Sequence, residues 1–242
     1  MRKITRKGEV EDAVHSALEA FRKNGNASLV RRLDESLFQN RVRFPLLESA
    51  AVLLYEAIPE KKQTEIIRAI ADTAQIGAFP VAGKWLQLRL GEHYKACFSQ
   101  AAEIIRQGDE WYVCDIIGER VFGYALLTKP VQTLKELEKL GRHENHWMVR
   151  VVGVAGHYAI KKGLPKNKVE ELFQLLLALS ETTDLHTKKG IGWAAKTTAK
   201  FYPGIIQRYA DEIENNPAIR PWFKTKIRIG LSRSFKYAGR FQ

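Results

Sequence analysis

Apolar residues recur at intervals of three and four along nearly the whole chain, and this period favours a fold made of helices. No segment alternates between apolar and polar residues for long enough to form a half-buried strand. Pro45, Pro80 and Pro130 stand at expected first turns, where a missing N–H costs no hydrogen bond. Asn167 and Glu170 resemble a capping box. We therefore expect an all-α protein with helices over residues 9–24, 27–38, 45–57, 60–74, 80–90, 92–107, 110–128, 131–141, 146–162, 167–181, 187–202, 204–214 and 218–235.

Three tryptophans near the starts of long expected helices suggest a repeated unit. Trp111, Trp147 and Trp193 are separated by 36 and 46 residues, and HEAT- and armadillo-like helix pairs repeat at roughly 40–47 residues. We expect antiparallel helix pairs to stack into an α-α superhelix, a HEAT/armadillo-like solenoid whose concave side binds its partner. It would form a single domain over residues 1–242, with residues 1–8 as a basic flexible tail. An irregular helical bundle is the alternative architecture.

Basic residues outnumber acidic ones, which points to a polyanionic partner. The chain has 39 Lys and Arg against 27 Asp and Glu, a formal net charge of +12. From Ala218 to the end there are seven basic residues and no acid. Phosphate polyanions release counterions when they bind such a surface, and this release drives association. Basicity alone fits DNA, RNA and an anionic membrane equally.

The sequence contains no pattern typical of a membrane span, a disulfide framework or a metal site. The longest apolar run, Ala50 to Tyr55, is far shorter than the about 20 residues that span a bilayer, and no signal-peptide core follows the basic N-terminus. Cys97 and Cys114 fit buried thiols in a reducing compartment. Histidines and cysteines form only isolated pairs, whereas a zinc site needs three or four ligands. We expect a cytoplasmic protein without metal or cofactor.

Three expected helices carry patterns that suit a binding surface. Trp111 and Asp115 lie one helical turn apart, so an indole and a carboxylate share a face. Taken alone, this pair also fits a tryptophan between repeats, with Asp115 capping a helix or pairing with Arg120. A second face combines a tryptophan with three cations, and a third helix aligns three further basic side chains: Lys189, Trp193, Lys196 and Lys200, then Arg150, His157 and Lys161. Basic stripes on helices related by a repeat would follow a nucleic-acid backbone.

Three segments, in this order and spacing, resemble the AlkD-like family of HEAT-like-repeat DNA glycosylases, which excise alkylated purines. They are EWYVCD over residues 110–115, HWMVR over 146–150 and GIGWAAK over 190–196. A weaker match is VRFPLL over residues 42–47. The similarity covers about residues 40 to 232. It implies an α-helical repeat fold and duplex DNA with alkylated bases as the partner.

The resemblance also implies a role for each matching residue. Trp111 and Trp193 would pack against the deoxyribose and backbone of the damaged nucleotide. Asp115 would be the catalytic carboxylate, and Arg150 would hold the DNA backbone near it. These four residues would converge on one concave cleft. The further DNA-binding residues that we expect are Trp147, Lys189, Lys196 and Lys200.

The chain departs from the family pattern at three positions. Lys196 stands where relatives often carry arginine, which keeps the charge but loses a bidentate grip on phosphate. Arg41 and Glu48 replace a glycine and a basic residue that are usual around the early proline turn. These two changes weaken the expected DNA contact near the N-terminus.

The expected chemistry needs few groups. An N3- or N7-alkylated purine carries a positive charge, so it leaves as a neutral base without being protonated first. A carboxylate between indole faces would then stabilise charge on the sugar and position water. We therefore expect a monomeric glycosylase that hydrolyses the N-glycosidic bond of such purines in duplex DNA. The alternatives are a non-enzymatic relative that binds DNA structures and a helical-repeat scaffold for protein interactions.

Overall fold

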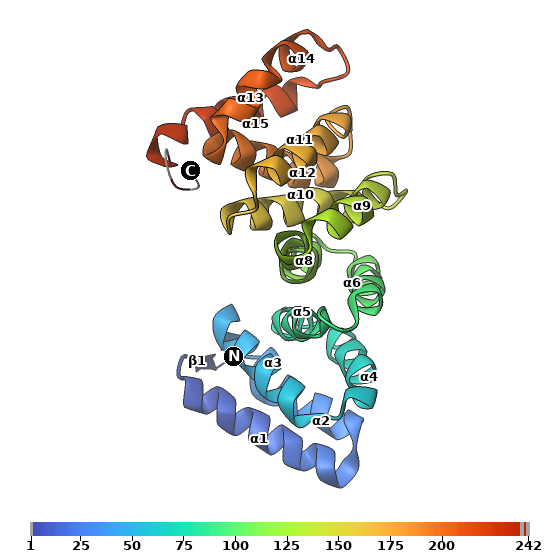
Figure 1. The fold of residues 1–242 in the computed structure, drawn as a ribbon. Coiled ribbons are helices and arrows are strands. Elements are labelled where there is room, and N and C mark those ends of the chain that lie inside the picture. The colour runs from blue at the N-terminus through green and yellow to red at the C-terminus, as the bar shows by residue number, and fades with distance from the viewer. Residues whose placement is uncertain (1, 238–239, 241–242) are drawn as a thin grey trace. The chain divides into compact units, whose positions relative to one another are not determined.

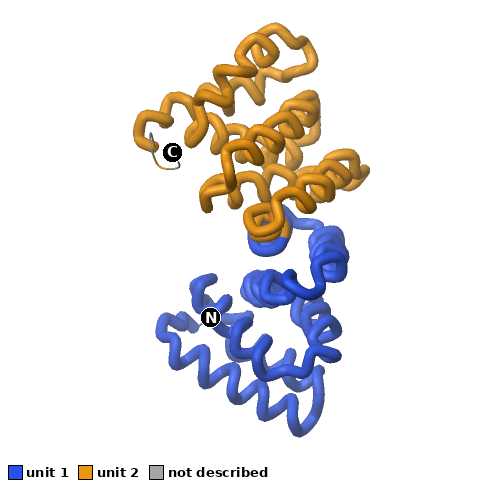
Figure 2. The backbone as a smooth tube through the Cα atoms, viewed as in Figure 1, with its two compact units in different colours: residues 1–121 blue, residues 122–242 orange. Residues whose placement is uncertain are grey.

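The computed structural model describes residues 2–237 and residue 240, and it consists almost entirely of α-helices (Figure 1). This confirms the predicted all-α fold class. By their contacts the helices fall into two compact units, residues 1–121 and residues 122–242, where the sequence predicts a single domain (Figure 2). No helix in the described ranges is both long and apolar enough to cross a bilayer.

Unit 1 contains α1 to α7, which pack mainly on near neighbours in the sequence. Helix α1 packs against α2 and α3, while α5 packs against α3, α4, α6 and α7. Leu33, Leu47, Ile66 and Trp85 are fully buried between these helices. The elements of the unit are β1 (Lys3–Ile4), α1 (Lys7–Asn24), α2 (Asn26–Leu33), the π-helix η1 (Asp34–Phe38), β2 (Arg41–Val42), α3 (Phe44–Ala57), α4 (Glu60–Ala71), α5 (Ala78–Arg89), α6 (Tyr94–Gly108) and α7 (Trp111–Ile117).

The N-terminal residues are part of the fold, which differs from the predicted flexible tail. Strand β1 pairs in parallel with β2, so that Ile4 lies opposite Val42. Ile4 is buried, and α1 already begins at Lys7. The two strands are only two residues long, too short to produce the alternation by which a strand is recognised in a sequence. Met1 lies outside the described residues.

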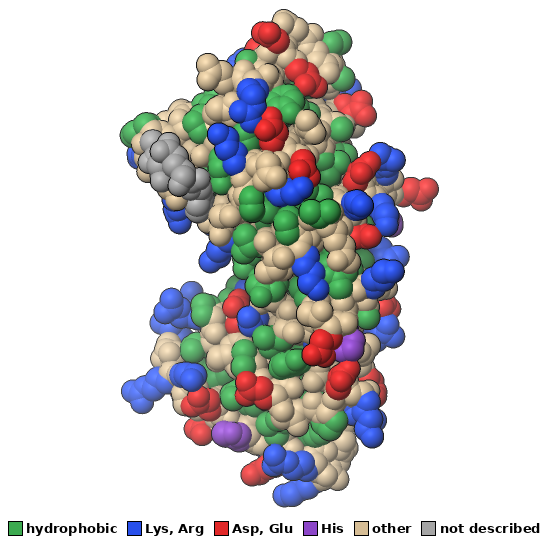
Figure 3. Space-filling model, viewed as in Figure 1, with side chains coloured by type: hydrophobic (Ala, Val, Ile, Leu, Met, Phe, Trp, Pro, Cys, Tyr) green, Lys and Arg blue, Asp and Glu red, His purple; other side chains and the backbone are tan. Residues whose placement is uncertain are grey.

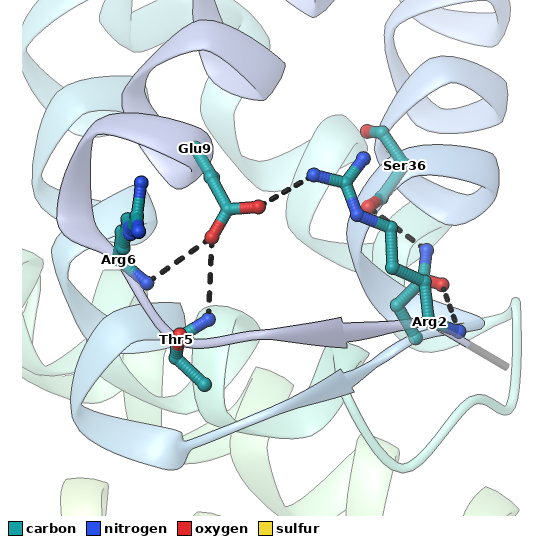
Figure 4. A network of polar contacts seen from close by, with 6 residues as sticks. Arg2, Thr5, Arg6, Glu9 and Ser36 are labelled. Atoms are coloured by element: carbon teal, nitrogen blue, oxygen red, sulfur yellow. Dashed lines mark hydrogen bonds and ion pairs between the residues drawn. The ribbon is translucent and has the colours of Figure 1, made fainter.

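Glu9 fastens this segment to the start of α1. Its carboxylate accepts hydrogen bonds from the backbone N–H groups of Arg6, at 3.2 Å, and Thr5, at 3.4 Å (Figure 4). It also pairs with the guanidinium of Arg2, and this hydrogen bond is the main reason that the pKa of Glu9 is lowered. The backbone N–H of Arg2 in turn donates to Oδ1 of Asn40. Glu9 therefore holds the basic N-terminal segment against the start of α1.

Unit 2 is built around α10 and α12. A Cβ atom on Gly153 would lie 2.1 Å from the carbonyl oxygen of Gly190, so the two backbones touch where these glycines meet. Helix α15 also packs against α12, and α9 packs against α10. The elements are α8 (Tyr124–Thr128), α9 (Pro130–Gly141), α10 (His146–Lys161), α11 (Lys166–Ala178), α12 (Leu185–Phe201), α13 (Pro203–Arg208), α14 (Ala210–Asn215), α15 (Pro221–Leu231) and the 3-10 turn η3 (Ser234–Tyr237).

Several details of the predicted helices are wrong for local reasons. The expected helix over residues 110–128 is interrupted by a π-helical segment, η2 (Gly118–Gly123), and the one over 204–214 breaks at Tyr209. The predicted capping box at Asn167 does not form, since α11 begins after Pro165. Glu170 binds Arg208 instead, accepting a hydrogen bond from its Nε at 2.9 Å.

Candidate nucleic-acid interface

Helix α7 of unit 1 presents the first predicted pair, Trp111 and Asp115. Asp109 adopts the left-handed conformation with φ 46° and ends α6, and α7 then starts at Trp111. The indole of Trp111 is 55% exposed, more than that of any other tryptophan in the chain. Asp115 follows one turn later and is half-buried. An exposed indole beside a carboxylate on the same helix face is suited to contact with a ligand.

The π-helical segment η2 begins at Gly118, directly after the helix that carries this pair. Gly118 and Phe122, which follow Trp111 by two and three helical turns, are buried. The predicted surface is therefore restricted to Trp111 and Asp115, at the beginning of the long helical stretch.

Arg120, which the sequence suggests as an alternative partner of Asp115, is paired with Glu48 of α3. Its guanidinium forms an ion pair of 2.6 Å with Glu48 and donates a hydrogen bond to the carbonyl of Ile116. It also lies 5.6 Å from the ring centroid of Phe44. Glu48, one of the departures from the family pattern, thus has a structural function as the partner of Arg120. The sequence alone gave no sign of this ion pair, because its members are 72 residues apart.

Helix α12 of unit 2 carries the second tryptophan, and a buried histidine supports it. The rings of Trp193 and His157 stack with centroids 3.8 Å apart and planes inclined by 22°. Nδ1 of His157 lies 2.7 Å from the hydroxyl of Thr197, and this hydroxyl donates to the carbonyl oxygen of Trp193. Because the hydroxyl hydrogen is used in that bond, Nδ1 of His157 must carry its own hydrogen and donate it to Thr197. The ring is thus fixed in one orientation beneath the indole.

His157 is neutral, although its sequence position places it in a basic stripe. Burial lowers its pKa to about 3, and the charges of Lys161, Lys196 and Lys200 act in the same direction. At neutral pH the imidazole therefore carries no charge. His157 is a neutral support for Trp193, and the cationic stripe that the sequence predicts on α10 is interrupted at this position.

The three predicted lysines lie on α12 with Trp193. Lys189 is exposed, while Lys196 and Lys200 are half-buried. Nζ of Lys200 lies 3.7 Å from the ring centroid of Tyr237, a cation–π contact that holds the ammonium group near the C-terminal turn η3. In the face drawn in Figure 3, acidic and basic side chains are both spread over the two units. The basic residues therefore do not gather on this face, whereas Lys189, Lys196 and Lys200 are grouped with Trp193 on α12.

Trp147 and Arg150 of α10 are placed in the interior. The side chain of Asn145 caps this helix by accepting a hydrogen bond from the N–H of Trp147 at 2.9 Å. The indole of Trp147 is only 3% exposed and packs against both His146 and His186, whose ring centroids each lie 4.4 Å from its own. This burial argues against the predicted DNA contact of Trp147, which is better explained as a packing residue.

Arg150 is also buried, at 5% exposure. Its Nη1 donates a hydrogen bond of 2.9 Å to the carbonyl of His186, in the first turn of α12. Its aliphatic stem lies against Gly190, where a Cβ atom would come within 2.7 Å of Cγ of Arg150. Arg150 therefore fastens the beginning of the helix that carries Lys189 and Trp193.

Two features outside the predicted site, a groove and a group of three side chains, have the form of a ligand site. A groove of about 660 Å³ lies between α9 and α11, but none of the predicted site residues lines it. Among the described residues, one group of three side chains could bring metal ligands together: Glu60, Glu92 and His93. Both glutamates are exposed, and Glu60 is already paired with Nε2 of His93 at 2.7 Å. Exposed carboxylates often meet in this way without an ion.

The buried cysteines agree with the sequence prediction. Cys97 and Cys114 are both buried thiols. Burial raises the pKa of Cys97 to about 11, so this thiol is not a nucleophile at neutral pH. Neither cysteine extends the candidate interface.

Comparison with known proteins assigns the chain to a family. No curated protein matches the chain, and no solved structure matches it. The family model described as "DNA alkylation repair enzyme" matches residues 17–223, which include most of both units and all the site residues discussed above. The match extends well beyond half of the chain. The protein therefore belongs to the DNA alkylation repair enzyme family and has a role in alkylation repair.

Proposed function

We propose that the protein is a DNA glycosylase that excises positively charged N3- and N7-alkylated purines from duplex DNA by hydrolysis of the N-glycosidic bond. The observation that carries the proposal is the exposed indole of Trp111 one helical turn from the carboxylate of Asp115. Family membership supplies the context of alkylation repair. Both residues also stand in the segment that resembles AlkD-like glycosylases.

The proposed reaction breaks the bond between C1′ of the deoxyribose and the purine nitrogen. The bonding electrons move into the cationic purine, which leaves as a neutral base and needs no proton from an acid. Positive charge then develops on the sugar, and the carboxylate of Asp115 stabilises it. Water adds to C1′ and gives up a proton, for which Asp115 is the acceptor. One carboxylate is enough, whereas glycoside hydrolases that protonate a poor leaving group use two.

Trp111 and Trp193 would contact the damaged nucleotide through their ring faces. The face of an indole is electron-rich and favours a cationic sugar or base. The stack of His157 on Trp193 keeps that indole in a fixed orientation before DNA binds. Such preorganisation lowers the entropy cost of placing the substrate.

The cations of α12 would bind the DNA backbone. Lys189, Lys196 and Lys200 are accessible on the same helix as Trp193. Arg150 is proposed to act as a positioning residue, because it fixes the first turn of this helix from within the fold. We propose that the residues of α7 and those of α12 act on the same bound duplex.

The direct test is release of free base from methylated duplex DNA by the purified protein, separated by chromatography and compared with unmodified duplex. We expect 3-methyladenine or 7-methylguanine to be released, with no release from the unmodified duplex. Tight DNA binding without any released base would show a non-enzymatic DNA-binding protein. Absence of both binding and release would favour a protein-interaction scaffold.

A further inference from the structure

Helix α15 approaches α12 unusually closely because two glycines lie in their interface. A Cβ atom on Gly230 of α15 would lie 2.4 Å from the carbonyl oxygen of Lys196. A Cβ atom on Gly192 of α12 would lie 2.9 Å from Cγ of Lys226. The stem of Lys226 therefore lies directly over Gly192, next to Trp193 in the sequence. A side chain at either glycine would force the two helices apart.

This close packing assembles four basic side chains, which we call the α12–α15 cation cluster: Lys196, Lys200, Lys226 and Arg233. Lys200 follows Lys196 by one turn of α12, and the backbone N–H of Arg233 donates to the carbonyl of Gly230, the residue that packs on Lys196. The pKa of Lys196 is lowered by burial first, and then by the charges of Lys226, Arg233 and Lys200. No carboxylate offsets these effects on Lys196. Among the described residues, no acidic side chain forms an ion pair with any member of the cluster.

The other basic residues of α15 provide a contrast within the same helix. Lys224 and Arg228 are one turn apart and both approach Glu214, at 3.8 Å and 3.7 Å. Nζ of Lys224 also donates to the backbone carbonyl of Glu214. The cations on that side of the helix are compensated by an acid of the same unit. Lys226, which faces α12, forms no ion pair with an acid among the described residues.

We propose that the α12–α15 cation cluster binds backbone phosphates of duplex DNA, so that α15 extends the phosphate-binding surface of α12. The identity of the polyanion as duplex DNA rests on the proposed function. A DNA strand presents closely spaced negative charges, and binding to it releases condensed counterions. Arg233 adds a guanidinium fork that can grip two phosphate oxygens. The lysine side chains contribute point charges beside it.

The test compares two double variants that remove equal charge from one region of the protein. Lys226→Gln with Arg233→Gln removes two members of the cluster, and Lys224→Gln with Arg228→Gln removes the two cations paired with Glu214. Binding to undamaged duplex DNA is measured by fluorescence anisotropy over a range of salt concentrations. The cluster variant should lose about two units of salt-dependence slope and bind tens of fold more weakly at about 0.1 M salt. The control variant should match wild type in both.

Further measurements distinguish a failure of the cluster proposal from a failure of the proposed glycosylase function. Single-turnover base release at saturating enzyme should be close to wild type for the cluster variant, because the cluster contributes affinity and not chemistry. If wild-type protein releases no base but the salt slopes differ as described, the proposed function fails and the cluster assignment stands. Equal slopes for the cluster variant and wild type would overturn the cluster, whether or not base is released. Should the double variant unfold, the exposed Arg233→Gln alone should lose about one unit of slope.

The same proteins are also mixed with a duplex RNA and with vesicles containing phosphatidylserine. We expect the cluster variant to lose more affinity for duplex DNA than for either of these. Loss of vesicle or RNA binding with unchanged DNA binding would contradict the assignment.

Discussion

Helix α7 of unit 1 and helix α12 of unit 2 each present a tryptophan, but the surroundings of the two indoles differ. Trp111 is exposed and has a carboxylate, Asp115, one turn away. Trp193 is half-buried, stacks on His157 and has lysines before and after it on the helix. The carboxylate can take part in bond cleavage, and the cations can bind phosphate. We propose a division in which the carboxylate of α7 supplies the chemical step and the lysines of α12 supply affinity for DNA.

The largest expected effect concerns the carboxylate of α7. Asp115→Asn keeps the shape of the side chain and removes the charge that would stabilise the sugar cation. We expect base excision under single-turnover conditions to fall by about 10²–10³, the usual cost of removing one preorganised electrostatic group. DNA affinity should change little. Glu110→Gln, which neutralises an exposed carboxylate beside Trp111, is the matched control and should retain wild-type excision.

The two tryptophans should be coupled if they contact one nucleotide. An indole face beside a desolvated cation contributes about 2 kcal/mol, so Trp111→Ala and Trp193→Ala should each reduce single-turnover excision by about tenfold or more. The double variant should lose less than the two effects combined, since contacting groups are not additive. Trp222→Ala, which removes a half-buried indole bonded to the carbonyl of Thr182, serves as the control. Strict additivity would indicate that the two indoles act independently.

Lys196 should influence binding and leave the chemical step nearly unchanged. Lys196→Ala should reduce the salt-dependence slope by about one unit. Lys196→Arg restores the residue usual in the family and should bind DNA more tightly than wild type, because a guanidinium can grip two phosphate oxygens. Lys139→Ala removes an exposed lysine that pairs with Glu136 and should leave binding unchanged. Binding curves of Lys196→Ala that superimpose on wild type at every salt concentration would remove this lysine from the interface.

The smallest expected effect is on stability and concerns His157. In the unfolded chain a histidine has a pKa near 6.5, but in the fold burial lowers the pKa of His157 to about 3. As the pH falls from about 6.5 towards 3, the unfolded chain binds a proton that the folded chain does not. The free energy of unfolding should therefore decrease over this range, by at most about 1.4 kcal/mol per pH unit from this group.

Replacing the histidine separates this effect from other titrations. His157→Phe keeps an aromatic ring beneath Trp193 and should lose less stability between pH 7 and pH 5 than wild type does. His15→Phe changes an exposed histidine of α1 and should follow the wild-type dependence. Denaturant unfolding at the two pH values measures the difference. An identical pH dependence in His157→Phe and wild type would show that folding does not lower the pKa of His157.

The features that the sequence predicts well depend on local spacing. The helices follow from their period, and the shared faces of Trp111 with Asp115 and of Lys196 with Trp193 follow from positions within one helix. Pro45 and Pro130 stand in the first turns of α3 and α9, as predicted.

The features that the sequence did not predict depend on contacts between distant segments. The burial of Trp147 is produced by His186 of another helix, and the ion pair of Glu48 with Arg120 joins α3 to η2. The place of Lys226 beside α12 is decided by Gly192, which leaves room for its stem. A basic stripe read from one helix cannot show which of its members will be buried or paired by another.

The division between α7 and α12 is tested most directly by measuring two quantities on the same methylated duplex, the dissociation constant and the single-turnover rate of base release at saturating enzyme. The measurement compares Asp115→Asn with Lys196→Ala. We predict that Asp115→Asn loses about 10²–10³ in rate with nearly unchanged affinity. We also predict that Lys196→Ala loses several-fold in affinity with a rate close to wild type. A wild-type rate for Asp115→Asn, or a loss of rate in Lys196→Ala as large as that expected for Asp115→Asn, would contradict the account.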